Sequence, residues 1–293
     1  MNQQSLNETI VEYLTSLEVR GQVQPSTVAA YKRSLRMLTE YTGDIVLNKF
    51  TISAVEAYHK SLLDRGITQI SSTPHLSAVR AFVRWCEKRN ISVPVRSTAV
   101  ELPKNPRALK NVPTEEDVRK LINSIKIKGV QNLRDLCIVS LLVSSGMRVG
   151  EIVSARIDKL DLKNHTLTIT GKGNKQRLVF FNASTAELLK EYLSRKKRKN
   201  SPYIFHSKKT FSPLTTRSVQ RLIAKRERMA GIGKFGPHAY RHFFACYALK
   251  GGADLFSVSK LLGHANIATT QIYLHVTNDG LREIHRKAFR GNI

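Results

Sequence analysis

Residues 236–276 read GPHAYRHFFACYALKGGADLFSVSKLLGHANIATTQIYLHV, and they place basic side chains and a tyrosine in short predicted helices. His238 and Arg241 are three positions apart, so on a helix they share a face and can converge on one small anion. Taken alone, such a pair is more often an ordinary surface pair. An anion-binding face is therefore one of two interpretations of this first helix.

A second predicted helix covers residues 253–262, since an aspartate near its start is a good N-cap and Gly263 is a good C-terminal stop. His264 is thereby left at the edge between helix and loop. Asn266 can cap a further helix that carries Tyr273, nine residues after His264. Each of these residues is more often part of a core, a cap or a loop, and only the ordered set indicates a common site.

The bulk composition predicts a basic protein with two globular domains. The chain has 293 residues, of which 41% are hydrophobic, and this suffices for two cores. Its formal net charge is +26, with 12 basic against 8 acidic residues up to position 100 and 36 against 14 beyond it. Such an excess implies a polyanionic partner. Nucleic acid is the first candidate, and the alternative is a basic protein adapted to its cell or to an anionic membrane surface.

The three cysteines, Cys86, Cys137 and Cys246, lie in apolar helical patterns without a C-x-x-C spacing, so neither a disulfide framework nor a structural zinc site is expected. The N-terminus lacks a basic stretch followed by an apolar one, and no run of about 18 apolar residues occurs. We therefore expect a cytoplasmic protein without a membrane segment, metal or cofactor.

Residues 1–91 predict a bundle of about four helices, because apolar residues recur there at helical spacing. The expected helix starts are Asn7 or Ser5, Pro25, Ser53 and a point near Ser72 to Pro74. Residues 92–113 contain four prolines and no apolar period, which predicts a linker. A second domain is then expected over residues 114–293, where Thr114 can cap the first helix.

Residues 133–145, LRDLCIVSLLVSS, predict a buried helix that is too short to cross a bilayer and ends at Gly146. Arg148 follows directly, with Glu151 three positions on. In isolation these two charges could be a plain surface pair, with Glu151 in an orienting or structural role.

Residues 157–181 then switch to short β-rich runs, which predict a three-stranded antiparallel sheet. The second turn, GKGNK, contains Lys172 between two glycines that allow backbone to approach a ligand. A lysine in such a hairpin is more often simply solvated, and Lys175 is the less favoured candidate. Helices are expected next over residues 184–199 and 215–229, and their basic residues are candidates for phosphate contacts: the run RKKRK, Arg217, Arg221, Lys225, Arg226 and Arg228.

The ordered motifs H-x-x-R-H, L-L-G-H and T-T-Q-I-Y resemble the C-terminal signature of the tyrosine recombinases, or phage integrase family. S-G-M-R-V-G-E-I is similar to the family's first arginine motif, and G-K-G-N-K-Q-R to its catalytic lysine hairpin. S-T-x-x-x-Y from Ser26 to Tyr31 and L-S-A-V-R-A-F-V-R-W resemble its core-binding domain, which grips one side of duplex DNA. The size and two-domain plan look most like Xer-type recombinases.

The resemblance implies a mostly α fold with a small antiparallel β-sheet, built from an N-terminal helical core-binding bundle and a C-terminal α+β catalytic domain. It also implies site-specific recombination through a 3′-phosphotyrosine intermediate and a Holliday junction. The implied catalytic residues are Arg148, Lys172, His238, Arg241, His264 and the nucleophile Tyr273.

Each group has an expected task in phosphodiester transfer. The two arginines would neutralise the phosphate and His264 would add a donor, while Lys172 would protonate the leaving 5′ oxygen. Tyr273 would need cationic surroundings or a base such as His238. Metal-assisted transfer needs clustered carboxylates, but the acids beyond residue 162 are scattered, so a metal-free covalent mechanism is preferred.

The implied partners are double-stranded recombination sites and further copies of the chain, as a tetramer on two sites that is nucleoid-associated when bound. The final amphipathic helix, GLREIHRKAF, either docks on its own domain or is exchanged with a neighbour. Two alternatives stay open: a type IB topoisomerase-like relaxation activity, and a non-enzymatic DNA-binding regulator. Tyr240 and Cys246 depart from the family pattern, and Tyr240 is a second phenol close to the site.

Overall fold

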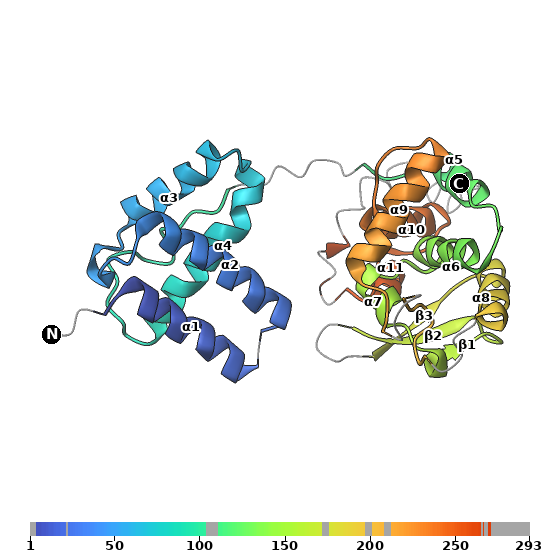
Figure 1. Cartoon of the computed structure of the whole chain (residues 1–293), viewed down its shortest axis with the longest axis horizontal. Helices are drawn as coiled ribbons and strands as arrows, with labels where there is room; N and C mark the ends of the chain where they lie inside the picture. Colours follow the sequence, from blue (N-terminus) through green and yellow to red (C-terminus); the bar gives the residue numbers. More distant parts are fainter. Residues whose placement is uncertain are drawn as a thin grey trace, which may run out of the picture. The chain divides into compact units, whose positions relative to one another are not determined.

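The computed structural model describes residues 4–21, 23–103, 111–171, 176–196, 201–207, 212–264, 266, 269 and 270. The chain forms two compact units, Met1–Ala108 and Leu109–Ile293 (Figure 1). In the first unit Val95 and Val100 are buried in the core, although both belong to the stretch predicted as a linker. The predicted domain bounds stay a prediction.

The described part of the first unit contains the helices α1 (Leu6–Arg20), α2 (Pro25–Thr42), α3 (Ile52–Asp64) and α4 (Gln69–Lys88) and a short 3-10 turn at Leu47–Lys49. Helix α1 begins after Ser5, whose hydroxyl accepts from the Glu8 backbone while the Glu8 carboxylate accepts from the Ser5 backbone, both at 3.1 Å. Helix α2 begins with Pro25. Proline has no backbone N–H, and at the first helical position this N–H would have no partner within the helix anyway. Both starts confirm the sequence prediction.

Aromatic side chains fill the core of the first unit. The ring of Tyr13 lies 5.8 Å from that of Phe82 and 5.5 Å from that of Trp85, so α1 and α4 share one aromatic cluster. Tyr58 of α3 is fully buried, and its hydroxyl donates to the Ser34 carbonyl of α2 at 3.2 Å. The four helices therefore form one bundle with a common core.

Helix α4 begins one turn earlier than predicted. Thr68 caps it by accepting from the Ser71 backbone at 3.3 Å, and Pro74 consequently lies inside the helix. A proline there removes one helix bond and frees one carbonyl, that of Ile70, whose side chain is exposed. Pro74 is also favoured in the first turn of a helix, so the sequence contains two competing start signals, and Thr68 is the one that caps α4.

The described part of the second unit contains seven α-helices: α5 (Glu115–Ser124), α6 (Val130–Ser145), α7 (Val149–Ser154), α8 (Ala183–Arg195), α9 (Thr216–Ala230), α10 (Pro237–Lys250) and α11 (Leu255–Leu262). Thr114 caps α5 as predicted, and Asp117 completes a reciprocal capping box. Helix α6 is the buried apolar helix expected from the sequence, and it packs against both α8 and α10 (Figure 1). Helix α6 is therefore the central support of the unit.

The predicted three-stranded antiparallel sheet is confirmed, with the order β1 (Leu160–Asp161), β2 (Thr166–Thr170) and β3 (Gln176–Phe180). Leu167 pairs with Val179 and Ile169 with Arg177, so these side chains share the face that packs on the core. Leu178 and Phe180 lie on the other face and are about half exposed. This register turns an arginine inward and two large apolar residues outward.

Candidate functional site

Arg148 lies at the junction between α6 and α7. Helix α6 ends at Gly146 with φ +62°, and a Cβ on this glycine would come within 2.5 Å of the Phe244 ring, so both the backbone and the space require glycine. Arg148 then caps α7: its backbone N–H donates to Oε2 of Glu151 at 2.7 Å, and its Nη1 donates to Oε1 at 3.0 Å. The Arg148 side chain is 44% exposed, so its guanidinium stays accessible.

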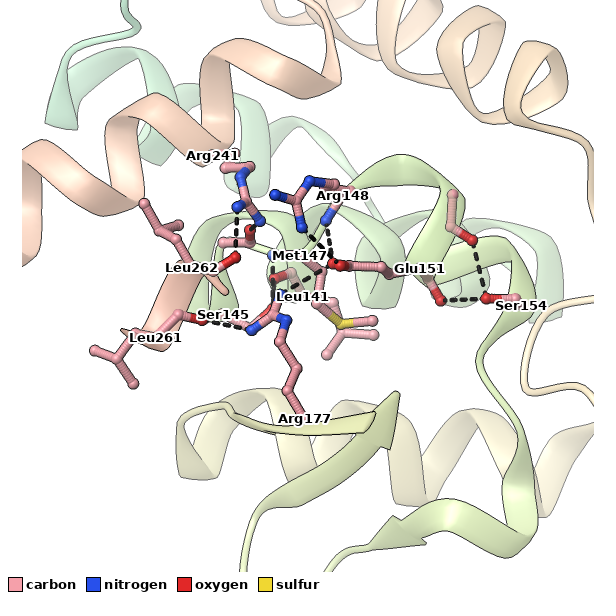
Figure 2. A network of polar contacts seen from close by, with 12 residues as sticks. Leu141, Ser145, Met147, Arg148, Glu151, Ser154, Arg177, Arg241, Leu261 and Leu262 are labelled. Carbon is pink, nitrogen blue, oxygen red and sulfur yellow. Dashed lines mark hydrogen bonds and ion pairs between the residues drawn. The ribbon is translucent and has the colours of Figure 1, made fainter. Parts of the chain in front are cut away.

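Arg241 joins the ends of two helices. Its side chain is almost fully buried, and its terminal nitrogens donate to the backbone carbonyls of Gly146, at 2.6 Å, and Leu262 (Figure 2). These bonds tie the C-terminal end of α6 to that of α11. The loops that carry Arg148 and His264 are therefore brought together by one side chain of α10.

His264 lies directly after the left-handed Gly263 that ends α11, as the sequence predicted. Its backbone N–H donates to the Ser259 carbonyl at 3.0 Å, and its Nδ1 lies 2.7 Å from the hydroxyl of Thr270. Burial lowers the pKa of His264 to about 4, and nearby positive charges lower it too: Arg241, Arg148, Arg177 and His238. The imidazole is therefore neutral at pH 7.

His238 lies in the first turn of α10, where it is exposed and its ring packs edge-on to that of His242 at 4.6 Å. The loop before α10 is held by Glu227, a buried carboxylate of α9. Its Oε1 accepts from the Gly236 backbone at 2.8 Å and from the Tyr240 hydroxyl at 3.0 Å. Glu227 therefore fixes the position at which α10 begins.

Tyr240, the second phenol near the site, is buried beside Glu227. Burial and the neighbouring carboxylate raise the pKa of its hydroxyl far above the usual range. A phenol that is both buried and harder to ionise is a poor nucleophile. Cys246, the other departure from the family pattern, is partly buried, and burial raises the pKa of its thiol.

Four of the six predicted site residues lie in the described structure, and the charges of three of them act on the fourth, His264. These four are Arg148, Arg241, His264 and His238. Lys172 and Tyr273 lie outside the described residues. The alternative that Arg148 and Glu151 form a plain surface pair is wrong, because the Glu151 side chain is only 6% exposed.

Arg177 is a member of this cluster that the sequence analysis missed. It extends from β3, donates through Nη2 to Oε2 of Glu151 at 3.0 Å and through Nη1 to the Leu261 carbonyl (Figure 2). In the sequence QRLVF the apolar residues Leu178 and Phe180 suggest that their face is buried. Val179 and Phe181 indicate the opposite register, because both lie an even number of positions from Arg177 and both are buried.

Two of the basic residues proposed as phosphate contacts are buried instead. Arg226 donates through Nη2 to Oδ2 of Asp135 at 2.7 Å inside the unit. Lys196, which follows α8, donates to the Tyr203 carbonyl at 2.6 Å, and burial lowers the pKa of its ammonium group. Helix α8 also ends four residues earlier than predicted. The cations of α9 that remain exposed are Arg217, Arg221, Lys225 and Arg228.

Among the described residues, no group of three or more His, Cys, Asp or Glu side chains is placed to hold a metal ion. No helix within those same ranges is long and apolar enough to cross a membrane. The groups that the described cluster offers to a ligand are guanidinium and imidazole side chains around one shared carboxylate, a combination suited to an anion.

Comparison with known proteins shows similarity over both units. The family profile described as "Phage integrase family" matches residues 111–279, and that of a phage integrase N-terminal SAM-like domain matches residues 10–90. The tyrosine recombinase XerC of Pediococcus pentosaceus is 32% identical over 297 residues, which cover 95% of each chain. XerD of Caulobacter vibrioides is 33% identical over 285 residues, which cover 93% of each chain.

A solved structure of the XerH site-specific recombinase, in a post-cleavage complex with a palindromic difH substrate, has a similar fold. Its TM-score is 0.69 at 25% identity, with 88% of this chain and 79% of that chain covered. The similarity therefore extends to a recombinase structure that contains DNA.

Proposed function

The chain belongs to the phage integrase family and is a tyrosine recombinase, an enzyme that cleaves and rejoins DNA in site-specific recombination, and we propose which of its residues carry out the reaction. The proposed set is Arg148, Lys172, His238, Arg241, His264 and Tyr273. One observation supports it most: the ends of α6 and α11 and the start of α10 bring Arg148, His264 and Arg241 to one cluster with excess positive charge.

Arg148 and Arg241 neutralise the scissile phosphate. The accessible guanidinium of Arg148 binds a non-bridging oxygen, and charge-assisted hydrogen bonds of this kind are worth about 1.5 to 3 kcal/mol each. Arg241 donates through its two terminal nitrogens to the backbone carbonyls of Gly146 and Leu262. Because its position is fixed by these carbonyls, Arg241 binds charge that develops at the phosphate without rearranging.

His264 acts as a neutral donor. We assign the Thr270 hydroxyl as the donor to Nδ1, 2.7 Å away, because this tautomer leaves the ring N–H at Nε2, where it can donate a hydrogen bond to a phosphate oxygen. A neutral imidazole is the form expected at pH 7 from the lowered pKa. His238, at the exposed edge of the same cluster, assists the nucleophile either as a base or through its positive charge.

Tyr273 is the nucleophile. Its oxygen attacks the scissile phosphorus, a bond between that phosphorus and the tyrosine forms, and the bond to the 5′ oxygen breaks. The tyrosine proton passes to a base such as His238, and Lys172 supplies a proton to the leaving 5′ oxygen. The free 5′ hydroxyl of the partner strand then attacks the phosphotyrosine, which restores the tyrosine and exchanges the strands.

The replacement of Tyr273 by phenylalanine tests this assignment. Tyr273→Phe should bind its site as the parent does but form no covalent complex on a suicide substrate, because only the attacking oxygen is removed. Denaturing gels measure the covalent complex. Tyr240→Phe is the matched control and should still form it, since that hydroxyl is buried against Glu227. A Tyr273→Phe protein that still traps DNA would rule out Tyr273 as nucleophile.

The DNA partner is a duplex recombination site, bound by both units, with the first unit as the core-binding domain. Support comes from the DNA-bound XerH relative and from the excess of basic residues. The exchange of two strands between two sites needs four active centres, which implies a tetramer and a Holliday-junction intermediate. The reaction takes place where chromosomal DNA lies, in the cytoplasm at the nucleoid.

Exchange of the C-terminal helix between protomers couples assembly to cleavage. A groove of about 540 Å³ in the second unit offers apolar walls for such a helix, from α5, α6 and α10: Val118, Ile122, Val143, Phe243, Phe244 and Tyr247. Leu281 and Ile284, with Ala288 or Phe289, would form the matching apolar face.

Truncation after Thr277 tests the exchange. The truncated protein should still fold and bind a half-site but lose cooperative binding to the full site, because the groove of each neighbour would stay empty. Gel shifts on half and full sites measure this, and circular dichroism checks the fold. Undiminished cooperativity would contradict the exchange.

A further inference from the structure

Glu151 lies between two arginines from different elements (Figure 2). Its Oε1 accepts from Nη1 of Arg148 and its Oε2 from Nη2 of Arg177, both at 3.0 Å. The Glu151 side chain is 6% exposed, that of Arg177 15%, and that of Arg148 44%. The buried carboxylate is thus shared between one mostly buried guanidinium and one accessible guanidinium.

A buried carboxylate beside a phosphate site opposes phosphate binding, because like charges repel strongly where water is excluded. If Glu151 were paired with Arg148 alone, it would cancel the charge of the arginine that faces the ligand. With Arg177 as a second partner, the two guanidinium groups and one carboxylate retain a net positive charge. The positive charge of Arg148 therefore stays available to bind an anion.

Arg177 also supports the turn before His264. Its Nη1 donates to the Leu261 carbonyl, and its Cδ lies 2.6 Å from the place that a Cβ on Gly263 would occupy. Gly263 has φ +63°, so glycine is favoured there by its backbone as well as by the closeness of Arg177. One side chain of β3 thus contacts the first turn of α7 and the C-terminal end of α11.

We propose that Arg177 is a positioning residue for the recombination reaction: it balances the charge of Glu151 so that Arg148 stays available to the scissile phosphate, and it fixes the turn that carries His264. This inference rests on the roles proposed above for Arg148 and His264. Arg177 itself need not touch the DNA, because both of its terminal nitrogens are bonded within the protein.

A double-mutant cycle that removes each of the two charges tests the balancing role. Arg177→Met keeps much of the side-chain length but removes the charge, and Glu151→Gln removes the opposing charge at nearly constant shape. We expect Arg177→Met to slow single-turnover covalent complex formation at saturating protein by roughly 10-fold or more, and the double variant to recover at least about 3-fold of that loss. The affinity of the protein for its DNA recombination site, measured by gel shifts, should change less than the cleavage rate.

A double variant as slow as Arg177→Met alone would overturn the balancing role. Arg177→Lys, which keeps the charge but cannot make both bonds in the same geometry, should cleave at an intermediate rate. If the Arg177→Met protein does not fold, Arg177→Lys is the variant that decides. A lysine variant that cleaves as fast as the parent would contradict the need for the contacts with both Glu151 and the Leu261 carbonyl.

The same unit offers a matched control pair. Asp135 also binds two arginines, with Nη2 of Arg226 at 2.7 Å and Nη2 of Arg134 at 2.8 Å. Asp135 lies ten residues, or about 15 Å along the helix axis, before the end of α6 at Ser145. Arg226→Met, alone or with Asp135→Asn, should leave the cleavage rate within about 3-fold of the parent wherever circular dichroism shows a folded protein. Equal slowing by Arg226→Met would mean that lost stability explains both effects.

Titration of His264 by NMR in the DNA-free protein requires no cleavage, so it separates this proposal from the assignment of the nucleophile. The charges that act on His264 are those of Arg241, Arg148, Arg177 and His238. Arg177→Met should raise the midpoint of its titration, and Arg177→Lys should leave the midpoint near that of the parent. An unchanged midpoint in Arg177→Met would overturn the role of Arg177 at the His264 turn, whatever the outcome with Tyr273.

Discussion

Asp135 and Glu151 each bind two arginines in the second unit, but the two clusters differ in how much guanidinium reaches solvent. At Asp135 the side chains of Arg226 and Arg134 are both mostly buried. At Glu151 the side chain of Arg148 is nearly half exposed. The Asp135 cluster therefore joins α6 to α9, while the Glu151 cluster leaves one guanidinium open to a ligand.

The surroundings of the two carboxylates explain why one cluster forms a site. Burying an ion pair removes both charges from water, so the pair by itself is weak support for either stability or function. Around Glu151, however, Arg241 is held by backbone carbonyls, and the combined cations help to keep His264 neutral. A local excess of positive charge, rather than an ion pair as such, indicates anion binding.

Removal of the more exposed arginine from each cluster, Arg148 or Arg134, should produce the largest difference between them. Arg148→Ala should slow covalent cleavage by roughly 100-fold or more, since deletion of one donor to the developing charge typically costs that much. Arg134→Ala, the matched change at Asp135, should slow it by less than about 3-fold. Single-turnover cleavage on a suicide substrate measures both, and similar rates for the two variants would remove the distinction between the clusters.

A smaller effect is expected from the pH dependence of stability. His264 takes up its proton near pH 4 in the folded protein and near pH 6.5 when unfolded, so the unfolded chain binds more protons between these values. Its contribution to the free energy of unfolding is complete above pH 6.5 and is lost as the pH falls toward 4. Denaturant unfolding at pH 7 and pH 5 measures the loss.

His264→Gln should reduce this loss of stability, because the variant has no imidazole to protonate. The Asp135→Asn protein should keep the loss, since it retains His264. If the parent and His264→Gln lost the same stability between pH 7 and pH 5, the lowered pKa of His264 would be contradicted.

The residues at which helices start and end could mostly be predicted from the local sequence. Ser5, Pro25 and Thr114 begin helices as expected, and Gly146 and Gly263 end them, since caps and left-handed glycines act within a few residues. Starts failed where two signals competed, as at Thr68 and Pro74 in α4. The fold class and the family also followed from the sequence, because the short motifs are specific and ordered, and the comparisons confirm both.

The sequence by itself placed Arg148, Arg241 and His264 in the right turns and helices, since each position depends on neighbours along the chain. Only the tertiary structure decided that Arg177 faces inward, that Glu151 is shared and that Arg226 and Lys196 are buried. Strand register is set by packing across the sheet, and a slip of one residue reverses every side chain. The charge balance of the site depends on which cations lose contact with water, and that is fixed by residues distant in the sequence.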